Sequence, residues 1–178
     1  MQGSPCRTWA GLLGWLAAAA GCAGPLTATD AGFRHRRHGY TLAAPGGPGP
    51  AWERVDVEGA VLAFRREGPD TISLVSRCGQ PVAAPQVMAR HLVIGIPDRT
   101  TLASGPIEIG GRSGWVQTFD AVRDGAVVRV KTVSLVADGC SFDWMLASAG
   151  AFEPAERAFD AWWQSFRLDP ERYGEAAP

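Results

Sequence analysis

The chain has 178 residues, 46% of them hydrophobic, and its formal net charge at pH 7 is -1. This length and apolar fraction are those of one globular domain with a short leader. A nucleic-acid-binding domain usually carries a strongly basic face, so a chain this close to neutrality is not expected to bind nucleic acid.

The first 21 residues have the organisation of an export signal. One positive charge, Arg7, precedes an apolar run from Trp9 to Ala20, and small residues follow. A helix of this run would be roughly 18 Å long at 1.5 Å per residue, whereas the hydrocarbon core of a bilayer is about 30 Å thick. We therefore predict that residues 1–21 are a signal peptide that is cleaved.

A cysteine stands directly after the predicted signal peptide. The sequence AAGC, which ends at Cys22, resembles the lipobox of bacterial lipoproteins, in which small residues precede a cysteine that receives diacylglycerol. Ala19 occupies the position at which the strongest lipoboxes have leucine. We expect Cys22 to be lipidated and to attach the chain to a membrane. Cleavage by ordinary signal peptidase and retention of the leader as an anchor are the alternatives.

Residues 22–38 show no sustained hydrophobic period and end in a basic cluster that runs from Arg34 to His38. They are expected to form a flexible tether, with a root-mean-square span of roughly 22 Å after Cys22. The cluster can contact anionic headgroups, each basic residue contributing on the order of 1 kcal/mol near such a surface. A solvated linker without a specific contact is the alternative.

The pattern of residues 39–168 predicts one domain. Alternating apolar residues bounded by turn signals predict strands, and apolar residues at three- and four-residue spacing predict helices. Strands are expected at 39–45, 60–66, 71–78, 104–111, 113–122, 125–136 and 140–148, and helices at 84–96 and 154–168. Short links make the later strands antiparallel neighbours, so the fold class is α+β, an antiparallel sheet with a mid-chain helix and a C-terminal aromatic helix packed on it. Residues 169–178 are expected to be a disordered tail.

The number of cysteines predicts one disulfide. Cys6 leaves with the leader and Cys22 is expected to carry lipid, so Cys78 and Cys140 remain. An exported protein is expected to join two remaining cysteines, because the envelope is oxidising. A redox-active pair is the alternative, but such pairs usually have Cys-X-X-Cys spacing, which this pair lacks.

The order of elements resembles the PsbP-like fold of the Mog/PsbP superfamily. The resemblance lies in the opening GYTLAAP followed by Trp52, the strand TISLVSRC, a mid-chain helix, a meander that carries GWVQTF, and the closing FDAWWQSFRL. The superfamily includes photosystem and Ran-binding proteins and small envelope lipoproteins of Gram-negative bacteria. The resemblance implies an α/β/α sandwich and a binding or assembly role without catalysis, and it identifies no partner residue.

The sequence contains no motif typical of a catalytic centre, a cofactor or a metal site. His91 is a lone histidine on a predicted helix, and HExxH and paired Cys–His spacings are absent. The segment GGRSG around Ser113 lacks the spacing of a nucleophile elbow. Trp163 follows Trp162 on a helix and points about 100° away from it, so one of the two is expected at the edge of the core. An exposed Trp163 would be a binding hot spot.

These observations predict a lipid-anchored envelope protein that binds a protein partner without catalysis, cofactor or metal. Ala23 after the lipidated cysteine favours the outer membrane, with the domain facing the periplasm. The alternative is a small-molecule or lipid-binding protein with a cavity under the C-terminal helix. An enzyme would need a polar cluster that converges in a cleft.

Overall fold

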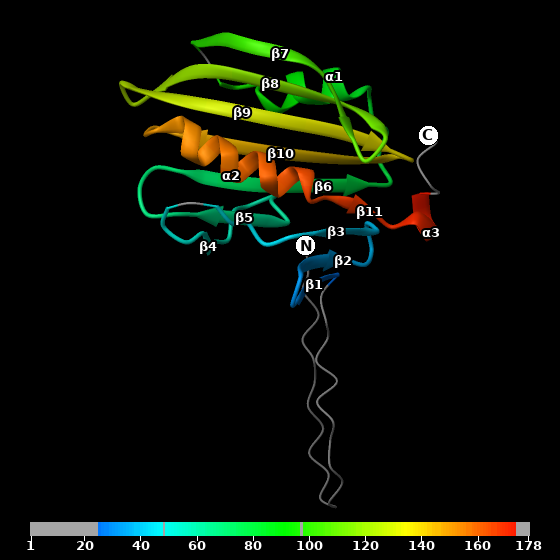
Figure 1. Ribbon diagram of the computed structural model, residues 1–178. Coiled ribbons are helices and arrows are strands. Elements are labelled where there is room, and N and C mark those ends of the chain that lie inside the picture. The colour runs from blue at the N-terminus through cyan, green and yellow to red at the C-terminus, as the bar shows by residue number, and fades with distance from the viewer. Residues whose placement is uncertain (1–24, 48, 97, 174–178) are drawn as a thin grey trace, which may run out of the picture.

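The computed structural model describes residues 25–47, 49–96 and 98–173. These residues form two antiparallel sheets, and helices pack against them (Figure 1). The large sheet has the strand order β4-β5-β6-β10-β9-β8-β7. Its strands are β4 (Glu53–Arg54), β5 (Leu62–Arg65), β6 (Thr71–Cys78), β7 (Arg99–Ile109), β8 (Arg112–Arg123), β9 (Ala126–Ala137) and β10 (Cys140–Ser148).

A small sheet stands below the large one in Figure 1, with the order β1-β2-β3-β11. Its strands are β1 (Leu26–Thr29), β2 (Gly32–His35), β3 (Tyr40–Leu42) and β11 (Arg167–Leu168). The α+β class predicted from the sequence is confirmed.

Tight turns set the register of the long strands. Asp124 and Gly125 join β8 to β9 with φ of 52° and 77°, and Asp138 and Gly139 join β9 to β10 with φ of 44° and 74°. Positive φ at both central residues is the requirement of a type I′ turn, and its twist matches that of the flanking strands. Asp-Gly therefore fixes both hairpins.

Helices α1 (Pro85–Leu92) and α2 (Phe152–Gln164) lie on opposite faces of the large sheet, and the short α3 (Pro170–Tyr173) ends the described chain (Figure 1). Neighbouring residues of β9 show the two faces, because successive side chains of a strand point to opposite sides. Lys131 bonds carboxylates of α2, whereas Val130 packs with Val93, which follows α1. We call these the α2 face and the α1 face.

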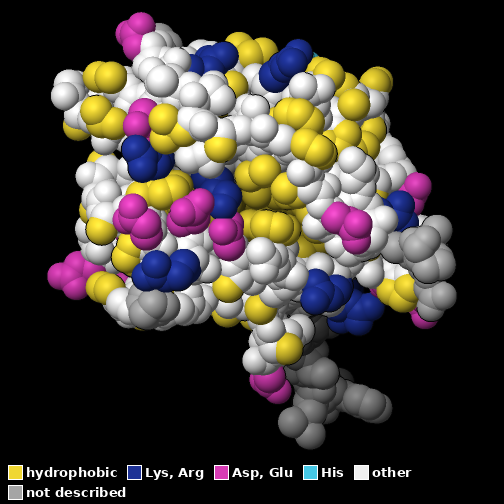
Figure 2. All heavy atoms as spheres, turned by 45° about the horizontal axis from the view of Figure 1, so that its top comes forward, with side chains coloured by type: hydrophobic (Ala, Val, Ile, Leu, Met, Phe, Trp, Pro, Cys, Tyr) yellow, Lys and Arg dark blue, Asp and Glu magenta, His cyan; other side chains and the backbone are white. Residues whose placement is uncertain are grey.

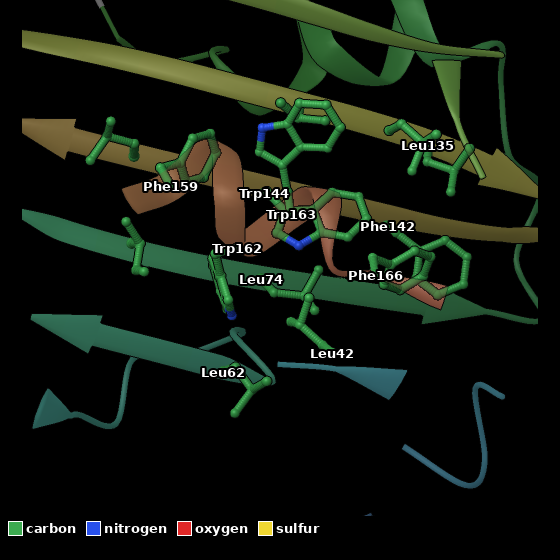
Figure 3. Packing of buried hydrophobic residues seen from close by; sticks show 14 of the residues in the cluster. Leu42, Leu62, Leu74, Leu135, Phe142, Trp144, Phe159, Trp162, Trp163 and Phe166 are labelled. Carbon is green, nitrogen blue, oxygen red and sulfur yellow. The ribbon is translucent and has the colours of Figure 1, made fainter. Parts of the chain in front are cut away.

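The main core lies on the α2 face, between β10 and the aromatic side of α2 (Figure 3). Trp144 of β10 meets Phe166 edge to face, with ring centroids 4.9 Å apart, and Phe142 lies 5.0 Å from the same ring. Trp162 is 1% exposed and its indole N–H donates to the Ala43 carbonyl at 3.0 Å. Each buried ring stabilises the fold by roughly 1.5 to 3 kcal/mol.

Cys78 and Cys140, the pair expected to join, form a disulfide. The two residues are direct partners in the β6–β10 register, with Cα atoms 4.1 Å apart. The bond links the end of one strand to the start of its neighbour.

The predicted flexible tether is wrong for Leu26 onward, because β1 and β2 form a hairpin that belongs to the domain. Phe33 packs on Phe64 at a centroid distance of 5.7 Å, and His35 is 3% exposed. Leu26 and His35 are register partners, and Leu26 and Phe33 both pack against the main core. This apolar side gives the hairpin enough burial to fold.

The predicted disordered tail is also wrong over the residues of α3. Asp169 accepts the Glu171 N–H at 3.1 Å, which caps the start of this helix. Tyr173 is 6% exposed, and its hydroxyl donates to the His38 carbonyl at 2.6 Å. The domain thus extends beyond the predicted bounds of 39–168 at both ends.

Candidate functional site

An open apolar groove of about 480 Å³ lies on the α1 face, beside the turn between β8 and β9. Its apolar lining consists mainly of Ile96, Ala121, Val128, Val130, Met145 and Ala147. Several of these side chains also belong to the small core cluster under α1, which is centred on Val93 and Phe119. The groove is therefore a continuation of that core into solvent.

The groove exists because α1 is much shorter than the strands that it covers. Eight helical residues extend roughly 12 Å, and twelve strand residues roughly 40 Å. Side chains of the sheet hold α1 and the segment after it in place. Gln117 donates to the Ala89 carbonyl of α1 at 2.8 Å. Arg99 donates to the carbonyls of Val93 and Ile96, which follow α1, at 2.9 Å each. The uncovered part of the sheet remains apolar.

Exposed apolar side chains stand at the margin of the groove. Ile94, next to Gly95 and Ile96 of the groove lining, is 73% exposed, and Val122, which also lines the groove, is 50% exposed. Val127, the register partner of Val122, is 58% exposed but lies beside Arg129 and Phe152 on the α2 face. A single exposed valine is ordinary on a protein surface, but a cluster beside an apolar groove is typical of an interaction site. The turn itself carries a charged pair, with Arg123 Nε 3.8 Å from Asp124.

Paired charges occupy the α2 face. Arg129 donates to both oxygens of Asp120, at 2.7 and 3.0 Å, and this hydrogen bonding holds the pKa of Asp120 below its ordinary value. Lys131 Nζ lies 2.8 Å from Glu156 and 2.8 Å from Asp160. Burial disfavours this ammonium, but the hydrogen bonds to the two carboxylates outweigh it and raise the pKa of Lys131. Figure 2 shows acidic and basic side chains next to one another on this side of the molecule. The pairs fasten α2 to the sheet.

Polar side chains meet where the β2–β3 turn contacts β6. The His38 ring nitrogen Nδ1 lies 2.7 Å from the Ser76 hydroxyl, the His38 backbone N–H donates to Nδ1 of His35 at 3.0 Å, and the two imidazoles stack at 4.2 Å. Burial, followed by repulsion from the protonated form of His38, lowers the pKa of His35 to about 4. Burial and the nearby Arg172 lower the pKa of His38.

A serine beside a histidine can be a nucleophile and its base, but this serine is enclosed. Ser76 is 6% exposed, and its oxygen also lies 3.4 Å from the Tyr40 hydroxyl, which is itself buried. The two neutral histidines fill the joint between the small sheet and the large one. The contacts of His35, His38 and Ser76 therefore have a structural role at the junction of the two sheets.

The structure places the predicted site residues as follows. Cys22 lies outside the described residues. Trp163 is 9% exposed, belongs to the main core, and donates its indole N–H to Asp160 at 2.9 Å (Figure 3), so the exposed hot spot expected there is wrong. His91 and Ser113 are exposed, on α1 and at the start of β8.

The groove was not foreseen from the sequence, although a signal for it exists. Apolar side chains occupy both faces at the end of the β8–β9 hairpin, with Ala121 and Val122 before the Asp-Gly turn and Val127 and Val128 after it. A hairpin tip with one solvated face would alternate apolar and polar residues.

Within residues 25–173, apart from the undescribed positions 48 and 97, no three His, Cys, Asp or Glu side chains are grouped so that they could hold a metal ion. None of the described helices combines the length and apolar character needed to cross a membrane.

A long antiparallel sheet with a helix on each face and an aromatic closing helix defines a PsbP-like α+β fold. No family model matches the sequence, and no curated protein matches it. Among solved structures, the chain is similar to cyanobacterial PsbP (CyanoP) from Synechocystis sp. PCC 6803, with a TM-score of 0.56 and 15% identity over 86% of this chain and 98% of that one. It is also similar to LpqN, involved in cell envelope biogenesis of Mycobacterium tuberculosis, with a TM-score of 0.53 and 17% identity over 74% of this chain and 83% of that one. At such identities the likeness shows the fold, which is the fold expected from the order of elements.

Proposed function

We propose that this chain is a lipid-anchored protein of the bacterial cell envelope whose domain binds a protein partner and catalyses no reaction. The observation that carries the binding role is the apolar groove on the α1 face. Its open apolar floor and exposed rim match the centre of protein interfaces, where charged residues are scarce and apolar anchors are buried on binding.

The envelope location rests on the leader and on Cys22. The lipobox-like AAGC supplies the attachment point, and Ala23 after it favours the outer membrane with the domain in the periplasm. LpqN, a protein of the same fold, is involved in cell envelope biogenesis, which supports an envelope role for this domain.

Metabolic labelling with palmitate tests the anchor. The protein is expected to incorporate the label, and Cys22→Ala is expected to abolish it. Unchanged labelling of the variant would refute lipidation at this residue.

Photo-crosslinking tests the groove. A photoreactive residue at Val122, on the rim, is expected to give one discrete protein adduct in intact cells. Val57, an exposed valine in the segment between β4 and β5, is the matched control position, since it is 44% exposed and Val122 is 50% exposed. The adduct should disappear when Ile94→Glu places a charge on the rim. Equal adducts from both positions, or none from Val122, would exclude the groove as the binding surface.

A small apolar molecule is the second candidate for the groove, since its volume lies in the range of ligand sites. The location expected for such a ligand, under the C-terminal helix, is wrong because Phe159, Trp162 and Phe166 fill that space at 0 to 1% exposure. Native mass spectrometry of the protein purified from envelopes distinguishes the two candidates. A bound small molecule that is lost in Ala147→Phe would favour the ligand over the protein partner.

A further inference from the structure

Arginines gather on the outer face of the small sheet and on the segments beside it. Arg34 of β2 and Arg167 of β11 are both register partners of Thr41, so the three side chains lie in one row on the exposed face of this sheet. Arg36 and Arg37 follow β2, and both are exposed.

Helix α3 adds another arginine to this surface. Arg172 is exposed and donates to the Arg37 carbonyl, which places it beside the β2–β3 turn. We call this surface the arginine face and define it by Arg34, Arg36, Arg37, Arg167 and Arg172.

The arginine face has a net positive charge. The acidic residues beside it are Asp169, which lies 3.4 Å from Arg34, and Glu171 of α3. Five arginines and two acidic residues leave a net charge of +3. The whole chain has a net charge of -1, so positive charge is concentrated at this end of the molecule.

The arginine face lies beside Pro25, at which the described chain begins. The Arg36 backbone N–H donates to the Pro25 carbonyl at 2.9 Å, so the first described residue lies beside Arg36. Cys22 precedes Pro25 by three residues, which span at most about 11 Å when fully extended. This reach is half the span expected for a flexible tether, and it is close to the Debye length of about 8 Å at physiological ionic strength.

We infer that the arginine face binds the anionic phospholipid surface of the membrane to which Cys22 attaches the chain, so that the domain lies on that membrane in one orientation. This inference rests on the proposed lipidation of Cys22 for the choice of surface. A membrane fits better than an acidic protein because the arginines are spread over an open sheet face and the described chain begins beside Arg36, three residues after Cys22.

The orientation directs the groove away from the membrane. In Figure 1 the small sheet lies at the lower side of the molecule, and β7 and α1 lie at the upper side. The groove, beside α1 and the β8–β9 turn, therefore remains open to a partner in the surrounding compartment.

Lipid-headgroup quenching in reconstituted vesicles tests the orientation. The mature lipidated protein carries a fluorophore at Thr41→Cys, in the centre of the arginine face, or at Thr100→Cys, an exposed position on β7 at the opposite edge. In phosphatidylglycerol-containing vesicles, a headgroup-attached quencher is expected to quench the Thr41 label and to leave the Thr100 label bright. The difference should vanish in pure phosphatidylcholine or at high salt.

Arginine substitutions measure how strongly the arginine face favours the membrane-bound orientation. If each arginine favours the membrane-bound orientation about fivefold, replacing Arg34, Arg36 and Arg37 with glutamine lowers the ratio of bound to unbound orientations about 100-fold. The matched control replaces three exposed arginines outside the small sheet, Arg90 of α1, Arg123 of β8 and Arg157 of α2, in the same way, and it should leave the quenching unchanged.

Three results would overturn the inference: equal quenching of both labels, quenching at Thr41 that survives high salt and the three substitutions, or protection of the Thr41 label by an acidic protein instead of by lipid. If palmitate labelling fails, the same labels on the mature secreted chain, added to the same vesicles, test the arginine face without the anchor. Failure of the anchor and failure of the arginine face are thereby distinguished.

Discussion

His35 is expected to make the fold sensitive to mild acid. Its ring is 3% exposed and stacks between those of His38 and Tyr40, and burial lowers its pKa from 6.5 to about 4. Arg37 and Arg172 act on this pKa in the same direction. Between about pH 6.5 and about pH 4 the unfolded chain therefore binds more protons than the folded chain. The stability that neutral His35 contributes is complete above this window and is lost as the pH falls through it.

The size of this stability loss follows from the pKa of His35, which is 6.5 in the unfolded chain and about 4 in the folded chain. Linkage gives a decrease in the free energy of unfolding of about 2 kcal/mol at about pH 5 and of about 3 kcal/mol at about pH 4. His35→Gln removes the titration but keeps an acceptor for the His38 N–H. The wild-type protein should therefore lose about 2 kcal/mol more than this variant between about pH 7.5 and about pH 5.

Urea unfolding followed by tryptophan fluorescence measures the effect at each pH. Carboxylates contribute to the pH dependence of both proteins equally, so the difference between them isolates His35. His91→Gln, on the exposed part of α1, is the matched control and should behave as the wild type. Identical pH dependence of the wild type and His35→Gln would refute the reasoning, as would an NMR titration that places the pKa of His35 near 6.5.

Three other changes have expected magnitudes, all measured as free energies of unfolding. Lys131→Met leaves its two half-exposed carboxylate partners on α2 without a cation and should cost about 2 kcal/mol, and no loss would show that the ion pairs do not fasten the helix. Replacing Cys78 and Cys140 together by alanine opens a loop with a sequence separation of 62 residues and should lower the free energy of unfolding by about 4 kcal/mol. The double variant should then be as stable as the wild-type protein after its disulfide is reduced. Phe159→Ala removes a ring that is 0% exposed and should cost about 3 to 5 kcal/mol, whereas a cost below 1 kcal/mol would contradict the packing of α2.

The long strands and the aromatic helix could be predicted because their local signals agree with their environment. The strands β8, β9 and β10 are nine to twelve residues long, alternate apolar and polar residues over much of that length, and are joined by Asp-Gly turns. The helix α2 repeats its aromatic residues at helical spacing. In such segments local preference and tertiary packing favour the same structure.

The ends of the helices depend on contacts with distant residues and could not be predicted. The closing helix was expected to reach residue 168, but it ends at Gln164, because Ser165 accepts the Ala43 N–H at 3.0 Å and Arg167 pairs with Thr41 of β3. The mid-chain helix was expected to reach residue 96, but it ends at Leu92, and Arg99 bonds the carbonyls of the following turn.

The candidate site was less predictable than the fold. The disulfide could be predicted from the number of cysteines that remain and from the oxidising compartment expected for an exported protein. The position of Trp163 could not be predicted, because the spacing of two adjacent tryptophans says only that their side chains diverge, and the buried side of α2 is wide enough to include both. The groove depends on how far α1 extends over the sheet, and no local pattern encodes that length.

The two ends of the described chain meet beside the β2–β3 turn, which has a practical consequence for tagging. Pro25 accepts the Arg36 N–H, and Tyr173 bonds the His38 carbonyl. A reporter fused behind α3 would therefore follow the chain from beside the arginine face, the surface that we propose to bind the membrane. The β8–β9 turn lies at the far end of β8, roughly 40 Å away along the strand, because the other end of β8, at Arg112, contacts Tyr173. A reporter there would avoid the arginine face but would stand beside the groove.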